Sequence, residues 1–339
     1  MNLVFVYLGR KIPKYVLDNF RMTVENFPSH SCFFVSDNSI MKSKIESAGG
    51  IFFLISNPAA TWKIDQNSMG YSPAFRDGFW YKTLARIYAL ERFALTHDEP
   101  FLHIESDVIL SVNFPFSRFL TIQSQLAYPL TTVDQGVAST LFVKNHKAIS
   151  SLLKFSERQI SQNNMATDVT ILGSYHQGNS DVMILPTAIP GTGMFTENTS
   201  LHNQELVSNN FDVFSGIFDA STWGQFILGE DERNSLGFRR IGHIQNHHLV
   251  NPANYPLEVL DDFISIRFFE KQIPIFALHV HCKDRRAFRA KTLKVILNEN
   301  ICQIRIGELS KFHLRTFLIL APGLLRYLLV RVLRFNEKK

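Results

Sequence analysis

The sequence predicts an α/β fold in which a mixed, mostly parallel sheet is flanked by helices. Short apolar runs alternate with longer helix-like segments through the first half of the chain, an order typical of parallel sheets covered by helices. The 339 residues suffice for one large domain with a sizeable core. Hydrophobic residues make up 45% and charged residues 19% of the chain, which is ordinary globular composition and argues against disorder.

The first half of the chain supplies four strand candidates and two helices. Each strand candidate is a short apolar run: Leu3–Leu8, Cys32–Val35, Ile51–Ile55 and Phe101–Ile104. Helices are predicted over Tyr15–Asn26 and over Phe79–Leu95, and the second has no Gly or Pro and repeats apolar residues at helical spacing. Ligands of such sheets bind at the carboxyl ends of the strands, and both Asp37 and the pair Glu105 and Asp107 lie at such ends.

The second half continues the pattern and then changes in character. Strands are predicted over Leu126–Tyr128, Ser139–Val143 and Val182–Leu185. A helix of about ten residues is predicted to begin near Asp168, with Thr167 as its N-cap. Residues 191–254 are rich in Gly, Asn, Ser and Phe, which indicates long loops with short helices, and loops of this size in enzymes usually bind substrate.

Charge and cysteine content exclude several classes of protein. The net charge of +5 is modest, and no nucleic-acid partner is predicted from it. Three cysteines, Cys32, Cys282 and Cys302, are odd in number and lack C-x-x-C spacing, which favours a reducing compartment over a disulfide framework. The apolar N-terminus has no basic region or cleavage site, so a first strand is expected there, and no apolar run predicts a transmembrane helix.

The first candidate site is the carboxylate pair Glu105 and Asp107, which interrupts the apolar run 100–110. In a β-strand the residues i and i+2 project to the same face, so both carboxylates are expected to point the same way. Two neighbouring negative charges in a buried strand are costly, and a divalent cation such as Mg²⁺ or Mn²⁺ relieves that cost. The alternative is a strand end with two solvated acids.

A second cluster lies in the apolar segment 273–283. His279, His281 and Lys283 alternate with apolar residues, so a strand would place all three on one face. A neutral imidazole can complete the coordination of a divalent ion, and a lysine beside it suits a phosphate. The alternative is a strand with one solvent-facing side. His247 and His248 lie in a polar loop and are expected at the surface.

Two further segments carry weaker signals. Lys82 and Arg86 lie one helical turn apart and repel one another, which indicates either an anionic partner or a solvated helix face. The segment Phe218–Asn234 combines apolar anchors, two glycines and several acids, and is interpreted as an acceptor-site loop followed by a short helix.

The ordered set of these segments resembles bacterial glycosyltransferases of the GT-A type, a Rossmann-related fold, of the kind found in surface-polysaccharide synthesis. The resemblance covers roughly residues 1–290 and depends on six segments in order: Phe79–Arg86, His103–Val108, Ala138–Asn145, Thr167–Leu172, Phe218–Asn234 and Leu278–Lys283. It implies one GT-A-like domain over residues 1–305, with a donor half at about 1–145 and an acceptor half at about 146–290.

The resemblance implies a nucleotide-sugar donor, expected to be a UDP-sugar, and a Mn²⁺ or Mg²⁺ cofactor. Asp107 is the expected metal ligand, with Glu105 near the metal or the ribose, and His279 or His281 as the third protein ligand. Lys283 would offset the charge of the departing diphosphate. Glu105 stands where the family's DxD motif has Asp, which makes Asp107 the safer ligand. The further candidates for donor contacts are Tyr7, Asp37, Lys82 and Arg86.

The expected catalytic acid on the acceptor side is Asp168, with Asp219 as the alternative. A helix N-terminus at Asp168 predicts that its carboxylate stays ionised. An inverting enzyme needs such a base to deprotonate the acceptor hydroxyl, but neither residue decides between inversion and retention. A metal-dependent nucleotidyl- or phosphotransferase could use the same carboxylate pair. A degenerate, membrane-associated assembly partner is the non-enzymatic alternative.

The C-terminal tail, residues 306–339, is predicted to be basic and amphipathic. Arg326, Arg331 and Arg334 would lie opposite most of its leucines on a helix. Such an element suits the surface of an anionic bilayer, which predicts a peripheral protein on the cytoplasmic face of the cell membrane with a glycan or lipid-linked acceptor. The alternative is a terminal helix that packs on the domain.

Overall fold

The computed structural model describes residues 1–197, 199–231, 240–245, 248–260 and 263–313. Within these ranges eight strands form a main sheet in the order β3-β2-β1-β4-β8-β6-β7, with β9 also pairing with β6. They are β1 (Asn2–Val6), β2 (Cys32–Ser36), β3 (Ile51–Leu54), β4 (Phe101–Ile104), β6 (Leu126–Thr132), β7 (Gln135–Gly136), β8 (Thr140–Val143) and β9 (Val182–Leu185). Strands β3, β2, β1 and β4 run parallel, β8 is antiparallel to both its neighbours, and β9 is parallel to β6. The predicted mixed, mostly parallel sheet is confirmed.

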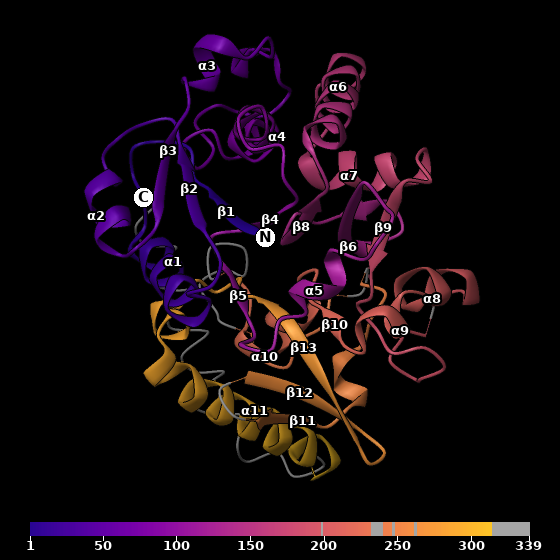
Figure 1. Cartoon of the computed structure of the whole chain (residues 1–339). Coiled ribbons are helices and arrows are strands. Elements are labelled where there is room, and N and C mark those ends of the chain that lie inside the picture. Colours follow the sequence, from indigo (N-terminus) through magenta and orange to yellow (C-terminus); the bar gives the residue numbers. More distant parts are fainter. Residues whose placement is uncertain (198, 232–239, 246–247, 261–262, 314–339) are drawn as a thin grey trace, which may run out of the picture.

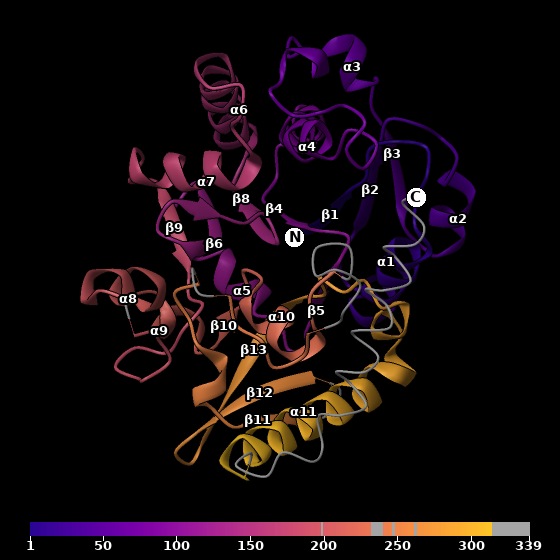
Figure 2. The same cartoon turned by 180° about the vertical axis from the view of Figure 1, so that it is seen from behind.

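A second sheet lies below the main sheet in the view of Figure 1. In the described part of the chain its order is β10-β13-β12-β11, and β5 also pairs with the carboxyl-terminal part of β13, at Ala277–His279. Its strands are β5 (Val108–Leu110), β10 (Ile217–Phe218), β11 (Leu257–Leu260), β12 (Phe263–Phe268) and β13 (Lys271–His279). The chain therefore crosses from the main sheet to the second sheet between β4 and β5. Helix α11 (Ala290–His313) packs against β11 along the lower edge of the molecule (Figures 1 and 2).

Helices cover both faces of the main sheet because successive side chains of a buried strand point to opposite faces. In β1, Leu3 and Phe5 belong to one buried cluster, with Phe20 of α1 (Lys14–Asn26). Val4 belongs to the cluster on the other face, which includes Leu84 of α4 (Phe79–Ala94).

The remaining helices of the described residues are α2 (Lys42–Ser47), α3 (Pro58–Thr61), η1 (Gln66–Ser68), α5 (Phe116–Phe119), α6 (His146–Gln162), α7 (Asp168–Gln177), α8 (Leu201–Ser208), α9 (Phe211–Phe214), α10 (Thr222–Leu228), η2 (Pro252–Asn254) and η3 (Arg285–Phe288).

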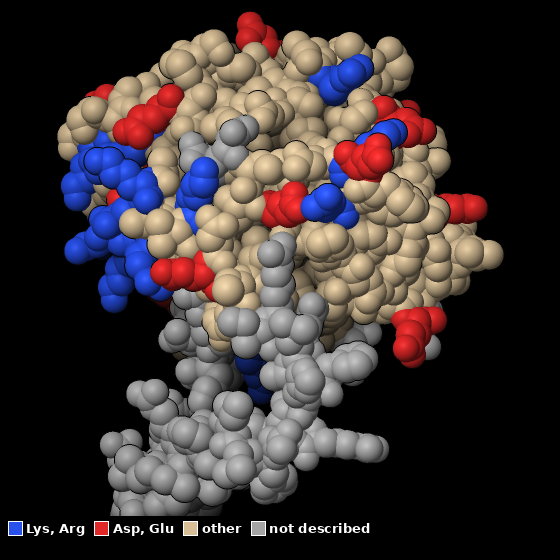
Figure 3. All heavy atoms as spheres, turned by 90° about the horizontal axis from the view of Figure 1, so that it is seen from below, with Lys and Arg blue, Asp and Glu red and all other residues tan. Residues whose placement is uncertain are grey.

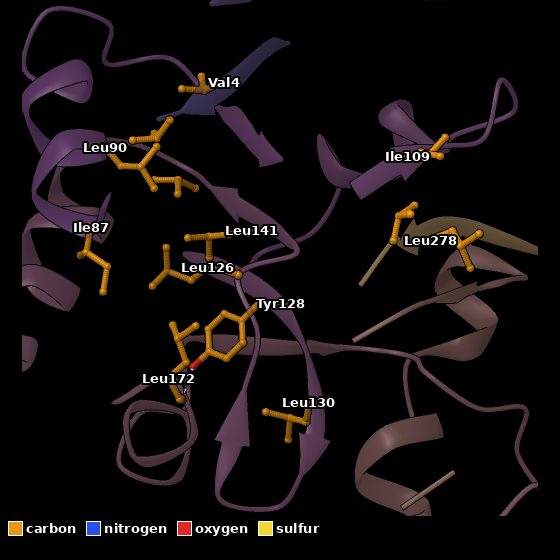
Figure 4. Close-up of a cluster of buried hydrophobic side chains, with 14 of the residues drawn as sticks. Val4, Ile87, Leu90, Ile109, Leu126, Tyr128, Leu130, Leu141, Leu172 and Leu278 are labelled. Carbon is orange, nitrogen blue, oxygen red and sulfur yellow. Dashed lines mark hydrogen bonds between the residues drawn. The ribbon is translucent and has the colours of Figure 1, made fainter. Parts of the chain in front are cut away.

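The core on the α4 face joins the sheet to the helices that carry the site. Figure 4 shows Leu90 of α4 and Leu141 of β8 among the apolar side chains of this cluster. The buried Tyr128 hydroxyl of β6 donates a hydrogen bond of 2.7 Å to the Leu172 carbonyl of α7. A buried hydroxyl needs such a partner, and this one fixes α7 against the antiparallel half of the sheet.

The main predicted elements form close to their predicted bounds. Helix α4 begins at Phe79 as predicted and ends one residue early, at Ala94. Helix α7 begins at Asp168, and the Thr167 hydroxyl caps it by accepting the N–H of Thr170. In its described residues the segment 191–254 forms loops and short helices, as predicted, together with the short strand β10. The strand predicted over 273–283 is too long at its carboxyl end, because β13 stops at His279.

The C-terminal region is described only as far as His313. Helix α11 runs through the predicted domain boundary at residues 305 and 306, and the predicted membrane-associating tail from 314 to 339 lies outside the described residues. Figure 3 shows Lys and Arg side chains gathered on one side of the face seen from below. Exposed basic residues of η3 and early α11 are Arg285, Arg286, Arg289, Lys291 and Lys294. No helix among the described residues is both long and apolar enough to cross a bilayer.

Candidate active site

Glu105 and Asp107 lie in the turn that joins β4 to β5, and not in a strand as predicted. The turn is closed by a 3.0 Å hydrogen bond from the Val108 N–H to the Glu105 carbonyl. Its start is held to the main sheet, because the Glu105 N–H donates to the Ser139 carbonyl at 3.1 Å. The two carboxylates therefore converge through a turn at the carboxyl end of β4, and strand alternation is the wrong explanation for their proximity.

The end of β13 brings His279 to this turn. Strand β5 pairs antiparallel with β13, and the register sets His279 opposite Val108. One residue further on, the Val280 N–H donates to the Asp107 carbonyl at 2.7 Å. The chain then turns, with the His281 N–H donating to the His279 carbonyl at 3.1 Å. The predicted single strand face for His279, His281 and Lys283 is therefore wrong, because a turn separates the last two from the strand.

Three side chains of this region could hold one divalent cation. Ligand atoms of Glu105, Asp107 and His279 all lie within 4.8 Å of one another. His279 Nε2 is 3.5 Å from Glu105 Oε2 and 3.5 Å from Asp107 Oδ1, which is long for a hydrogen bond. Ligands about 2.1 Å from Mg²⁺ and at right angles lie about 3 Å apart, so the three side chains fit around one ion. We call Glu105, Asp107 and His279 the ligand triad.

Lys283 adds a positive charge beside the ligand triad, because its Nζ is 3.5 Å from Asp107 Oδ2. Burial alone would raise the pKa of Asp107, but the charges of His279 and Lys283 hold it well below its usual range. Burial likewise opposes the imidazolium form of His279, yet Asp107 and Glu105 raise the pKa of His279 to about 9. Without a metal, a protonated His279 therefore balances the two carboxylates at neutral pH.

This balance predicts how the stability of the metal-free protein depends on pH. A folded-state pKa of His279 of about 9, above the unfolded value near 6.5, stabilises the folded state fully below pH 6.5. That contribution is lost as the pH rises towards 9. Urea unfolding in EDTA at intervals from pH 6 to 9.5 should show the free energy of unfolding falling in wild type and less steeply in His279→Gln. Identical profiles would contradict the charge balance.

The affinity of the ligand triad for Mn²⁺ should rise from pH 6 to 9.5, because a ligand imidazole must lose its proton.

Arg86 of α4 links the turn to α7. It forms ion pairs with Glu105 and, at 2.8 Å from Nη2 to Oδ2, with Asp168, and its side chain is only 11% exposed. Its predicted role as an anion-binding residue needs correction, because two buried carboxylates already balance its charge. Burial raises the pKa of Asp168, although Arg86 opposes the shift. The helix N-terminus thus does not dominate the titration of Asp168, contrary to the sequence prediction.

Arg86→Met is expected to lower the free energy of unfolding by about 3 kcal/mol, because it leaves the buried Asp168 without its counter-charge and removes one of the two cations beside Glu105. Urea denaturation at pH 7.5 measures the difference, and the exposed Arg21→Met on α1 is the matched control. A loss no greater than that of the control would show that the two carboxylates do not depend on Arg86. Lowering the pH to 5 should recover part of the loss, because the raised pKa of Asp168 makes its neutral form accessible.

Asp219, the alternative catalytic acid, is fully buried and does not line the cavity. In the described residues its carboxylate accepts four backbone hydrogen bonds, of 2.7 to 3.0 Å, from Ser221, Trp223, Gly224 and His279. A carboxylate with all these partners is a structural acceptor that ties the start of α10 to the end of β13. Its predicted catalytic role is therefore replaced by a structural one.

The ligand triad opens onto a cavity of about 1030 Å³. The cavity brings together most of the sequence-predicted site residues: Tyr7, Lys82, Arg86, Glu105, Asp107, Asp168, His279, His281 and Lys283. Asp37 is outside this lining, and its Oδ1 accepts the Gly9 N–H at 2.9 Å. Lys82 Nζ is paired with Asp77 Oδ2 at 2.6 Å. Asp37 thus stabilises the turn at Gly9. It does not line the cavity, so its predicted role as a donor-binding residue is not supported.

Sequence reasoning missed several residues of the cavity wall. Aromatic side chains line it near α4, including Phe75, Phe79 and Trp80, and the Phe75 and Trp80 rings stack 6.3 Å apart. His248, expected at the surface, is 3% exposed and lines the cavity. Gln225 lines it from α10, and its polar side chain within the apolar run 223–228 was the available signal. No sequence pattern pointed to His248, because the polar residues 245–247 directly before it predicted a surface loop.

Neither a protein-family model nor a curated protein sequence matches the chain. Solved structures give low-identity likenesses over part of it. Mouse xyloside xylosyltransferase 1 in its apo form is 9% identical, with a TM-score of 0.39 over 55% of this chain and 84% of that one. The PaToxG glycosyltransferase is 14% identical, with a TM-score of 0.32 over 52% and 69%. A CMP:2-keto-3-deoxy-manno-octonic acid synthetase complexed with CTP is 7% identical, with a TM-score of 0.32 over 52% and 86%.

Proposed function

We propose that the chain is a metal-dependent glycosyltransferase that moves a sugar from a nucleotide-sugar donor to an acceptor hydroxyl. The observation that carries this proposal is the ligand triad beside Lys283 at the wall of a large cavity. A diphosphate needs concentrated positive charge, and a site with one divalent cation and one lysine provides it. The volume of about 1030 Å³ is ample for a nucleotide sugar.

The ligand triad would hold Mn²⁺ or Mg²⁺, whose chemistry is to neutralise charge on the diphosphate leaving group. Lys283 lies 3.5 Å from Asp107 and lines the cavity, so its ammonium can bind the same leaving group. Arg86 fixes Glu105 and Asp168 relative to each other. Each of these residues acts on binding or charge, and together they favour departure of a nucleoside diphosphate.

Asp168 is the proposed acceptor-side base. It lines the cavity, and burial raises its pKa towards the range in which a carboxylate is an effective base. It would take the proton of the acceptor hydroxyl in an inverting reaction. A retaining reaction would instead use it to position the acceptor, and the anomer of the product distinguishes the two.

The test is a calorimetric screen of UDP- and GDP-sugars with and without Mn²⁺, followed by product analysis. Metal-dependent binding and release of free nucleoside diphosphate are expected. Release of pyrophosphate from a nucleoside triphosphate and a sugar phosphate, assayed in parallel, would instead favour the nucleotidyltransferase alternative, which could use the same carboxylates. Absence of Mn²⁺ and nucleotide-sugar binding would favour the degenerate assembly partner.

The proposed acceptor is a glycan or a lipid-linked glycan of surface-polysaccharide synthesis at a membrane. This part of the proposal is supported by the sequence resemblance and by the basic amphipathic pattern of the tail. Flotation with phosphatidylglycerol vesicles at low and high salt tests it, because electrostatic attachment weakens with salt.

A further inference from the structure

Three buried polar atoms of residues in the cavity wall have no hydrogen-bond partner among the described residues; one is His279 Nδ1 of the ligand triad, and the other two lie outside the triad. These two are Gln225 Oε1 of α10 and His281 Nε2 of the turn after β13. Buried polar atoms in proteins are nearly always paired, and an unpaired one costs about 1–3 kcal/mol. Since both residues line the cavity, the partners that they lack can be supplied by a bound molecule.

Gln225 is held beside the ligand triad by the packing of α10. Asp219 Oδ2 accepts the N–H of Gly224 at 2.7 Å and that of His279 at 3.0 Å, so one carboxylate oxygen clamps the two backbones together. A Cβ on Gly224 would lie 1.8 Å from the His279 carbonyl oxygen, which only glycine avoids. Gln225 is the next residue, and its position relative to His279 is therefore fixed.

His281 flanks His279 from the other direction along the chain. The centroids of the two imidazole rings are 4.1 Å apart. The ring of His281 thus contacts that of a member of the ligand triad at a tilt of 31°, while its Nε2 lacks a partner among the described residues. Both residues consequently line the same cavity as the ligand triad, where the proposed diphosphate would be bound.

The chemistry of these atoms selects among the parts of a nucleotide sugar. An amide oxygen such as Gln225 Oε1 only accepts hydrogen bonds, so it is repelled by a phosphate oxygen and attracted to an O–H or N–H. His281 Nε2 can donate or accept, depending on its tautomer. Directly attached to the outer phosphate of a nucleotide sugar is the sugar ring, whose hydroxyls both donate and accept.

We propose that Gln225 and His281 form the subsite that binds hydroxyl groups of the transferred sugar and so contribute to the choice of donor. This inference rests on the proposed glycosyltransferase function. Gln225→Leu is expected to weaken nucleotide-sugar binding about 10-fold, since it removes a buried hydrogen bond. Binding of the nucleoside diphosphate, which lacks the transferred sugar, is expected to stay unchanged.

The experiment compares UDP with a panel of UDP-glucose, UDP-galactose and UDP-N-acetylglucosamine, plus GDP with GDP-mannose, by calorimetry in Mn²⁺. Gln225→Leu, Gln225→Glu and His281→Phe are compared with wild type, and Gln162→Leu, an exposed glutamine on α6, is the matched control. Gln225→Glu retains an acceptor oxygen and should keep more sugar affinity than Gln225→Leu. Selective loss for the sugar-bearing ligand supports the proposal, and equal loss for both ligands or for neither overturns it.

A second arm uses the unaltered protein and therefore does not depend on variant folding. Monodeoxy analogues of the sugar that wild type binds best are titrated in turn. One analogue should bind wild type about 10-fold more weakly than the parent. If every deoxy analogue binds wild type as well as the parent does, the subsite proposal is overturned while the glycosyltransferase proposal stands. If wild type binds no nucleoside diphosphate and no nucleotide sugar, both fail.

Discussion

Asp107→Asn is expected to abolish Mn²⁺-dependent nucleotide-sugar binding and to lower transfer by about 100-fold or more, the scale seen when metal sites lose a supporting group. Asp107 contacts both His279 and Lys283, and its side chain is only 14% exposed. Asparagine keeps the size of the side chain but removes the negative charge that a divalent cation and the two neighbouring cations require. Isothermal titration with Mn²⁺ and then with the donor measures both losses.

The matched control is Asp212→Asn, an exposed acid in the first turn of α9. Circular dichroism of both variants should match wild type, because the backbone contact of residue 107 is made by its carbonyl and is kept. Wild-type Mn²⁺ dependence in a folded Asp107→Asn protein would remove the ligand triad from the proposed mechanism.

Asp219→Ala is expected to lower the free energy of unfolding by about 4 kcal/mol or more. Four backbone N–H groups donate to this carboxylate in the described structure, and each buried donor left without a partner costs about 1–3 kcal/mol. The loss approaches the whole stability of many domains, so the variant should unfold at much lower urea concentration.

Asp219→Asn separates the structural role from the rejected catalytic one. Its amide oxygen can still accept from one pair of donors, while its NH₂ group faces the other pair, so an intermediate stability is expected. The folded fraction of Asp219→Asn should retain measurable turnover. A variant as stable as wild type but without turnover would restore Asp219 to the chemistry.

The sequence predicted the fold well wherever local periodicity and burial agree. Helix α4 and the central strands have apolar patterns that leave few alternatives, and their bounds shifted by only a residue or a few. The pairing of β5 with β13 joins residues about 170 positions apart in the sequence, and no local pattern encodes it. Long-range register of this kind comes from packing of the whole molecule.

The sequence identified most of the site residues by their chemistry, but it did not predict how they are arranged. Glu105 and Asp107 are close in a turn as they would be in a strand, so the spacing alone could not distinguish the two. Arg86 was recognised as an unusual cation, but its pairing with Glu105 and Asp168 depends on how α4 meets α7. The sequence around Asp219 does not distinguish a catalytic acid from a structural one. Only the four backbone N–H groups that donate to its carboxylate reveal the structural role.

The ligand triad spans the junction of two sheets. Glu105 leaves the main sheet after β4, whereas His279 ends a strand of the second sheet, and only the short turn between β4 and β5 connects them covalently at this point. A cation bound by both residues would link the two sheets at their junction. Amide hydrogens of β5 and β13 should then exchange with solvent more slowly when Mn²⁺ is present, even those far from the cavity. Mutations deep in the second sheet would consequently change metal affinity without touching a ligand.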